Sequence, residues 1–139
     1  MKKDQLLDAL KRVPLLSDLS RKDLERVAAD GREEMYSTGQ DIVTQGDSGG
    51  PFFMLLEGRA QILRDGKVRR TLEPGAYFGE MSLVDHKPRS ATVRAETNVR
   101  GLAIPSYSFM AMLESNFSLA KKVMAHLSNR VRELDDNAN

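Results

Sequence analysis

Turn-forming residues punctuate the middle of the chain at short and regular intervals. Between residues 32 and 104, dipeptides that contain Gly or Pro recur about every 8–12 residues and separate stretches rich in Val, Ile, Phe and Tyr. The strongest of these signals is Asp65-Gly66, which separates residues 61–64 from residues 67–70 and is typical of a two-residue hairpin turn. The spacing predicts about eight short antiparallel strands that form a β-roll over residues 31–104.

Helical periodicity is confined to the two ends of the chain. Residues 1–30 carry apolar side chains at helical spacing, interrupted by Pro14, and Ser20 is expected to cap the second helix. After Pro105, residues 106–134 show helical spacing again, and Ser106 is expected to cap the first segment. The sequence therefore predicts a single domain over residues 1–139 that is mainly β with flanking helices. Its β-roll, a double-stranded jelly roll, follows an N-terminal helical lead-in and precedes a C-terminal hinge and long helix.

The last helical segment carries one narrow apolar seam. Its members follow one another at steps of four, four, four and three residues: Leu119, Val123, Leu127, Val131 and Leu134. Such a seam is typical of a helix that packs lengthwise against a partner. The partner is either a second copy of the chain, which would make a homodimer, or the β-roll of the same chain. The spacing does not decide between the two.

The composition excludes several kinds of site. The chain has no Cys and only two His, His86 and His126, so it lacks the ligands of a cysteine-based zinc site or an iron–sulfur cluster. A net charge of +1 argues against a strongly basic nucleic-acid surface. No apolar run approaches the ~20 residues of a membrane span, and the N-terminus lacks a signal-peptide core. We therefore expect a cytoplasmic domain with no metal, no cofactor, no catalytic residues and no membrane contact.

The segment 74–93 combines features that a hydrophobic core does not need. Gly79 and Glu80 open a stretch that could form one helical turn, and helix N-termini present free amides to anions. Arg89 follows just after a Pro and offers a guanidinium fork suited to phosphate. A carboxylate beside an anion site suits a sugar hydroxyl, so the set describes a phosphate joined to a ribose. The alternative is a plain salt bridge between Glu80 and Arg89 that braces a loop.

The sequence YFGEMSLVDHKPRSATV at residues 77–93 resembles the phosphate-binding cassette of the cyclic nucleotide-binding domain family. We place this cassette at residues 78–93. Segments before and after it also resemble that family, as found in the sensor domain of bacterial catabolite activator proteins and in protein kinase A regulatory subunits. The resemblance covers nearly the whole chain in the order of the family's motifs.

The resemblance implies a role for each matching residue. Glu80 would accept a hydrogen bond from the ribose 2′-hydroxyl, and Arg89 would pair with the cyclic phosphate. Backbone amides around Gly79, Met81 and Ser82 would add donors, and the hydroxyl of Ser90 would contact the phosphate or a guanine amino group. Ile62 and Leu72 fall where the family places apolar residues near the base, although a strand slip of one residue would invert their faces.

The resemblance also implies a function. We expect a regulatory sensor domain, not an enzyme, that binds cAMP or cGMP. We favour cAMP because the surrounding sequence looks bacterial. Ligand capture would move the C-terminal helices and control an output that is either attached to this chain or carried by a partner. Because residue 139 closely follows the long helix, we expect no direct nucleic-acid binding by this chain, which is either a stand-alone sensor or a regulatory fragment of a larger enzyme or transcription factor. The alternatives are a degenerate interaction module that binds no nucleotide and a sensor of cyclic dinucleotides.

Overall fold

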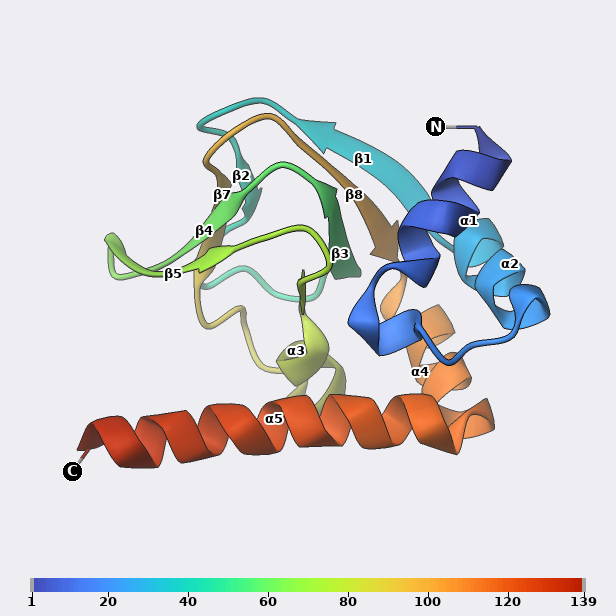
Figure 1. The fold of residues 1–139 in the computed structure, drawn as a ribbon. Helices are drawn as coiled ribbons and strands as arrows, with labels where there is room; N and C mark the ends of the chain where they lie inside the picture. Colours follow the sequence, from blue (N-terminus) through green and yellow to red (C-terminus); the bar gives the residue numbers. More distant parts are fainter. Residues whose placement is uncertain (1, 139) are drawn as a thin grey trace.

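Two four-stranded antiparallel sheets form the centre of the structure, a computed structural model that describes residues 2–138, with the side chains of 82–84 and 134–138 left out (Figure 1). The strand order is β1-β8-β3-β6 in one sheet and β2-β7-β4-β5 in the other. The predicted β-roll with flanking helices is confirmed. The strands are β1 (Arg32–Tyr36), β2 (Asp41–Val43), β3 (Phe52–Glu57), β4 (Ala60–Arg64), β5 (Lys67–Leu72), β6 (Tyr77–Phe78), β7 (Thr92–Ala95) and β8 (Val99–Ile104).

Strands β4 and β5 form the hairpin expected at Asp65-Gly66. They pair from Ala60 opposite Leu72 to Arg64 opposite Lys67, with a register shift between Ile62 and Leu63. The side chain of Gln45 clamps the hairpin turn, because its amide donates to Asp65 Oδ1 at 3.0 Å while its Oε1 accepts from the Asp65 N–H at 2.9 Å. The turn is thereby fixed to the loop that follows β2.

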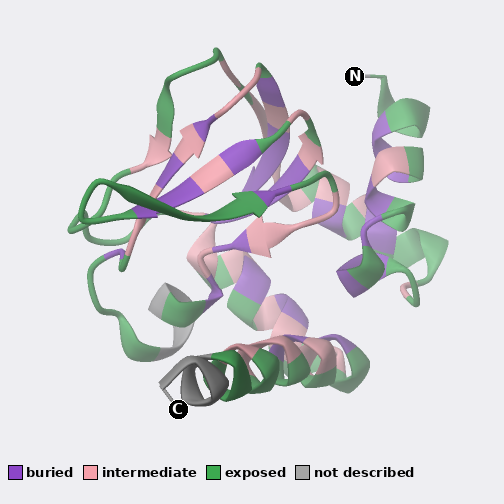
Figure 2. Ribbon diagram, turned by 60° about the vertical axis from the view of Figure 1, so that its left-hand side comes forward, coloured by how far each residue is buried: buried purple, intermediate pink, exposed green. Residues whose placement is uncertain are grey.

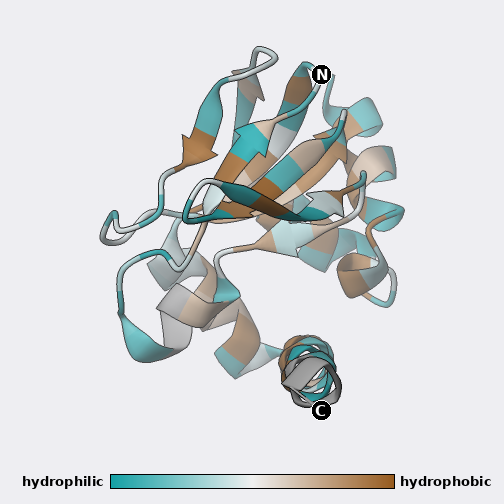
Figure 3. Cartoon of the chain, turned by 90° about the vertical axis from the view of Figure 1, so that its left-hand side faces the viewer, coloured by the Kyte–Doolittle hydropathy of each residue, from teal (hydrophilic) through white to brown (hydrophobic). Residues whose placement is uncertain are grey.

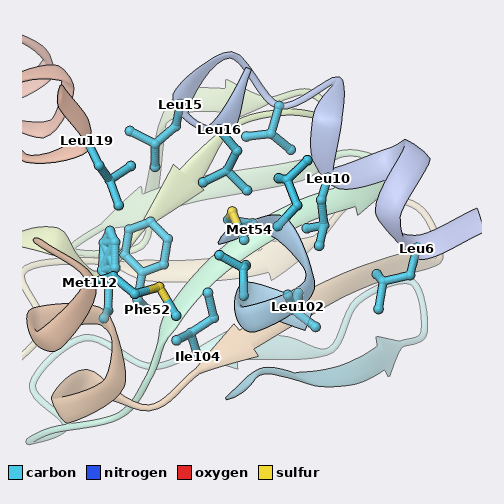
Figure 4. Packing of buried hydrophobic residues seen from close by; sticks show 14 of the residues in the cluster. Leu6, Leu10, Leu15, Leu16, Phe52, Met54, Leu102, Ile104, Met112 and Leu119 are labelled. Carbon is cyan, nitrogen blue, oxygen red and sulfur yellow. The ribbon is translucent and has the colours of Figure 1, made fainter. Parts of the chain in front are cut away.

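Strand β3 is buried on both faces and divides the core in two. Phe53 and Leu55 point between the sheets, where they join apolar side chains of β4, β5, β7 and β8. Phe52 and Met54 point the other way and are covered by helices from both ends of the chain (Figure 4). Buried residues are found both on the strands and on the helices (Figure 2). This double burial explains why β3 reads as an uninterrupted apolar run.

The N-terminal lead-in consists of α1 (Lys3–Lys11), a 3₁₀ turn at Pro14–Leu16, and α2 (Arg21–Asp30). The Ser20 hydroxyl accepts a hydrogen bond from the Asp23 N–H at 3.2 Å, so the predicted cap forms. These elements place their leucines on the outer face of the sheet that contains β3.

The C-terminal part contains α4 (Ser106–Ser115) and α5 (Phe117–Ala138). Ser106 is the first helical residue of α4, and Pro105 stands at the cap position. The predicted cap at Ser106 is therefore wrong. The Ser106 hydroxyl instead donates to the carbonyl oxygen of Gly50 at 2.9 Å. Gly50 lies in the loop before β3, so the Ser106 hydroxyl joins α4 to this loop. No described helix has the length and apolarity to cross a bilayer.

Helix α5 runs along one side of the roll, past the short helix α3 (Glu80–Asp85) (Figures 1 and 3). Leu119 and Val123 are buried in the part of the core that contains Phe52 and Met54 and lies between the sheet and the helices (the helix-side core). Leu127 packs against this part. Val131 is 57% exposed, while the side chain of Leu134 lies outside the described residues. Lys122 ties the first half of α5 to the lead-in through an ion pair of 2.8 Å with Asp18. The N-terminal half of the predicted seam thus packs on the chain's own core.

Candidate anion-binding site

A cavity of about 300 Å³ opens between the β-roll, α3 and α5. Its apolar wall comes from strands of both sheets, while α3, the loop up to β7, β4 and α5 supply its charged groups. The residues that line it are Val43, Ile62, Arg64, Phe78, Gly79, Glu80, Met81, Asp85, Lys87, Pro88, Arg89, Ser90, Ala91, Val93 and Arg130. Its volume lies at the lower end of the range typical of small-molecule sites.

Arg89 is held in this cavity by the main chain. Only 7% of the residue is exposed, and its Nε donates to the carbonyl oxygen of Gly49 at 3.0 Å. Its Nη2 donates to the carbonyl oxygen of Pro51 at 2.7 Å. Carbonyl oxygens carry no net charge, so this cradle orients the guanidinium without neutralising it. Burial lowers the pKa of Arg89, and the nearby Glu80 acts in the opposite direction. Arginine stays protonated in proteins, so the group remains a buried cation directed at the cavity.

Two glycines flank the Arg89 guanidinium. Gly79 has φ +101° and Gly50 has φ +96°, backbone conformations that other residues rarely adopt. A Cβ atom on Gly79 would lie 2.7 Å from Nη1, and one on Gly50 would lie 2.7 Å from Nη2. Both positions therefore need glycine for two reasons, the backbone conformation and the space.

The main chain of Arg89 is fixed as well. Its N–H donates to the Asp47 carbonyl oxygen at 2.8 Å, and its own carbonyl oxygen accepts from the Gly46 N–H at 2.9 Å. The hairpin clamp at Gln45 lies in the same loop, and the Gln45 N–H donates to the Thr92 hydroxyl at 2.9 Å. The carbonyl oxygen of the next residue, Ser90, accepts from Arg64 Nε at 3.3 Å. The arginine is thus positioned by backbone contacts on both sides.

Glu80 is a buried carboxylate, with 2% of the residue exposed. Its Oε1 lies 3.4 Å from His126 Nε2 and 3.8 Å from Arg130 Nη1, both on α5. Among the described residues neither Oε1 nor His126 Nε2 has a hydrogen-bond partner, so their contact is close but misaligned. The His126 ring packs against Tyr77, with ring centroids 4.7 Å apart. Burial, reinforced by the charge of Glu80, raises the pKa of Tyr77. Glu80 therefore faces both the cavity and α5.

The structure brings most of the predicted site residues together. Gly79, Glu80, Met81, Arg89 and Ser90 all line the cavity, and Ile62 contributes to its apolar wall. The side chain of Ser82 lies outside the described residues. Leu72 does not line the cavity but is buried between the two sheets.

Sequence reasoning did not identify Arg64, His126 or Arg130 as residues at the site. His126 and Arg130 are four residues apart, so they share one face of a helix, which is the signal that could have found them. The direction of that face depends on how α5 packs, and the local sequence does not specify it.

A buried guanidinium beside a buried carboxylate suits a ligand that carries both an anionic group and a hydroxyl. Among the residues that the structure describes, no three His, Asp or Glu side chains gather as a metal site would require.

A family model described as "Cyclic nucleotide-binding domain" matches residues 33–116. Among curated proteins, a cAMP-dependent protein kinase regulatory subunit of Eremothecium gossypii is 36% identical over 107 residues, which cover 76% of this chain and 23% of the relative. The chain thus spans about a quarter of that protein. Regulatory subunits of the same description from Schizosaccharomyces pombe and Yarrowia lipolytica are similar too. These relatives are fungal, so our expectation of a bacterial sequence is wrong.

Solved structures show the same fold. The cAMP-bound PfPKA-R (141–441) superposes with a TM-score of 0.87 at 28% identity, covering 97% of this chain and 47% of that one. The catabolite activator protein of Thermus thermophilus superposes with a TM-score of 0.80 at 29% identity, covering 90% of this chain and 61% of that one. The fold therefore occurs in both groups that the sequence resembles.

Proposed function

Because this chain belongs to the cyclic nucleotide-binding domain family, we propose that its cavity binds a 3′,5′-cyclic nucleotide, with cAMP as the first candidate. The observation that carries the proposal is the buried pair of Glu80 and Arg89 in the lining of one cavity. The choice of cAMP is supported by the names of the similar regulatory subunits and by the cAMP-bound state of a similar structure. It no longer depends on a bacterial origin.

The cyclic phosphate would occupy the space in front of Arg89. The carbonyl cradle leaves the positive charge of the guanidinium available, and a phosphate would supply the missing counter-charge. Amides around Gly79, Met81 and Ser82 would donate to the phosphate at the start of α3, and the Ser90 hydroxyl would lie within the same lining. This arrangement explains why a cation is buried here at all.

The ribose would lie against Glu80, whose carboxylate would accept a hydrogen bond from the 2′-hydroxyl. The base would then rest on the apolar wall that includes Val43, Ile62 and Val93. Leu72 would support this wall from the core without touching the ligand. Cyclic GMP shares the phosphate and ribose, so these groups alone do not choose between the two bases.

The regulatory output would begin at the C-terminal helices. The Ser106 hydroxyl at the start of α4 bonds to Gly50, which lies between the two residues whose carbonyls hold Arg89. Movement of Arg89 toward a phosphate would therefore be transmitted to α4 and then to α5. By similarity to the regulatory subunits, a protein kinase catalytic chain is the partner we propose. Of the predicted homodimer seam, Val131 is the described position that remains exposed for a second copy.

Isothermal titration of this chain with cAMP, cGMP and cyclic di-GMP tests the proposal. We expect one cAMP to bind per chain and to raise the melting temperature, because a ligand that binds only the folded state stabilises it. If only cyclic di-GMP bound, the proposal would be wrong and the domain would be a sensor of cyclic dinucleotides. If none of the three ligands bound, the domain would be an interaction module.

A further inference from the structure

The thioether of Met81 takes no part in the contacts proposed for the nucleotide, which use only the backbone near this residue. Met81 is the second residue of α3, it is 45% exposed, and it lines the cavity together with Glu80 and Arg89. A methionine sulfur in a packed core is protected from oxidants, whereas one that reaches solvent is open to them. The cavity therefore contains an oxidisable sulfur in its lining.

This position separates Met81 from the other methionines that the structure describes, because none of them lines the cavity. Met54 and Met112 are buried in the helix-side core. Three more are exposed on β1, α4 and α5, namely Met35, Met110 and Met124. Met81 is thus the described methionine that is both open to solvent and part of the candidate site.

The cavity is rich in hydrogen-bond donors. Three guanidinium groups line it, those of Arg64, Arg89 and Arg130. The carbonyl oxygens that hold Arg89 do not neutralise its charge. A strong acceptor on the Met81 side chain would be attracted to these cations and would occupy donors that an anionic ligand needs.

Hydrogen peroxide would create such an acceptor. The thioether sulfur attacks one peroxide oxygen, the O–O bond breaks as the S–O bond forms, and water leaves. The sulfur is oxidised by two electrons and the peroxide is reduced. The product is a polar sulfoxide, and a methionine sulfoxide reductase can return it to the thioether.

We propose that Met81 is a redox-sensitive modification site: oxidation of its sulfur places a sulfoxide oxygen in the cavity and weakens the binding of an anionic ligand there. The effect on nucleotide affinity rests on the proposed function. The reactivity of the sulfur and its effect on the cavity arginines do not. A ligand bound in the cavity should also shield the sulfur and slow its oxidation.

Peptide mass spectrometry after treatment with dilute hydrogen peroxide measures the reaction at each methionine. Without ligand, we expect Met81 to react at a rate close to that of the exposed Met124 and roughly tenfold faster than the buried Met54. Saturating cAMP should slow the oxidation of Met81 and leave that of Met124 unchanged. If Met81 reacted as slowly as Met54 without ligand, its sulfur would not be open to solvent and the proposal would be wrong.

Calorimetry with cAMP tests the consequence for binding. Met81→Leu cannot form a sulfoxide, and Met35→Leu is the matched control, because Met35 is 69% exposed and lies outside the cavity lining. Peroxide should lower the affinity of the wild type and of Met35→Leu by about three- to tenfold, the range of one net hydrogen bond. It should leave the affinity of Met81→Leu where it stood before treatment. A loss that persists in Met81→Leu would assign the effect to another methionine and overturn the proposal.

Glutamine imitates the oxidised side chain, because its amide oxygen is a permanent acceptor. Met81→Gln should therefore bind cAMP more weakly than the wild type without any peroxide, and Met35→Gln should not. Equal affinities in Met81→Gln and the wild type would contradict the proposed effect of an acceptor at this position.

The NMR signals of the Nε–H groups of the three cavity arginines separate this proposal from the proposed function, because they need no nucleotide. In the oxidised wild type we expect at least one of the signals of Arg64, Arg89 and Arg130 to shift, and none to shift in peroxide-treated Met81→Leu. Absence of cAMP binding before oxidation would refute the proposed function. Three unmoved arginine signals in the oxidised wild type would refute the redox site.

Discussion

Gly79 lies directly against the Arg89 guanidinium, so that a Cβ atom at this position would come within 2.7 Å of Nη1 and 3.0 Å of the Pro51 carbonyl oxygen. The glycine that opens α3 is therefore part of the slot that holds the arginine. Gly50 closes the slot from the other side.

Gly79→Ala should weaken cyclic nucleotide binding by about tenfold or more, because the added methyl group displaces the guanidinium from its cradle. Gly39→Ala is the matched control, since Gly39 also has a positive φ of +88° but has nothing within 4 Å of its Cβ position. Both variants place an alanine at a positive φ, but only Gly79→Ala brings a methyl group against the Arg89 guanidinium. Equal affinities for cAMP in calorimetry would show that the slot does not position Arg89.

Arg89→Ala should cost about 2–5 kcal/mol of binding free energy, the usual loss when one member of a desolvated charged pair is removed. This corresponds to roughly 30- to 5,000-fold in affinity. Arg64→Ala removes an exposed cation from the same cavity lining and should cost less. Thermal unfolding of both variants without ligand checks that they remain folded. Wild-type affinity in Arg89→Ala would show that the phosphate binds elsewhere.

Glu80→Gln should reduce the affinity for cAMP by roughly 10- to 150-fold, as expected from a charged hydrogen bond worth about 1.5–3 kcal/mol. The same change should matter much less for 2′-deoxy-cAMP, which lacks the hydroxyl. Glu80 also faces α5, so the substitution can change affinity without touching the sugar. Both ligands are therefore measured on the wild type and on Glu80→Gln, and the ratio of the two affinities isolates the contact with the 2′-hydroxyl. If the ratio of the affinities for cAMP and 2′-deoxy-cAMP is the same in both proteins, the ribose 2′-hydroxyl does not contact Glu80.

Val123→Ala should lower the free energy of unfolding by about 1–3 kcal/mol, because the side chain is 5% exposed and packs in the helix-side core. Val131→Ala, eight residues further along α5 at 57% exposure, should leave monomer stability nearly unchanged. Denaturant unfolding of the two variants measures the difference. If Val131→Ala alone destabilised the protein, and did so more at higher protein concentration, this part of α5 would be buried between two copies.

Local signals in the sequence predicted the β-roll and its hairpin. The turn at Asp65-Gly66 and the cap at Ser20 depend on a few neighbouring residues, and the structure contains both. Glu80 and Arg89 belong to one short segment, and the structure places both in the lining of one cavity, while their roles in ligand binding stay a prediction.

Features that depend on tertiary packing were not predictable. The approach of His126 and Arg130 to Glu80 depends on the rotation of α5, which Leu119 and Val123 fix through the core. Ile62 and Leu72 have the same hydrophobic character, and only the position of each strand decides which one reaches the cavity. Ser106 is of a residue type that caps helices, but Pro105 takes the cap position, and the Ser106 hydroxyl donates to a carbonyl oxygen in a distant loop.

The acceptors that hold Arg89 belong to the main chain of Gly49 and Pro51, so no exchange of side chains can delete them. Alanine at Gly49 or Pro51 would therefore leave the acceptor in place wherever the path of the chain survives, whereas alanine at Gly50 would collide with the guanidinium. Insertions, deletions or a single-atom replacement of the amide by an ester in the loop would be the changes that reveal its contribution to ligand capture.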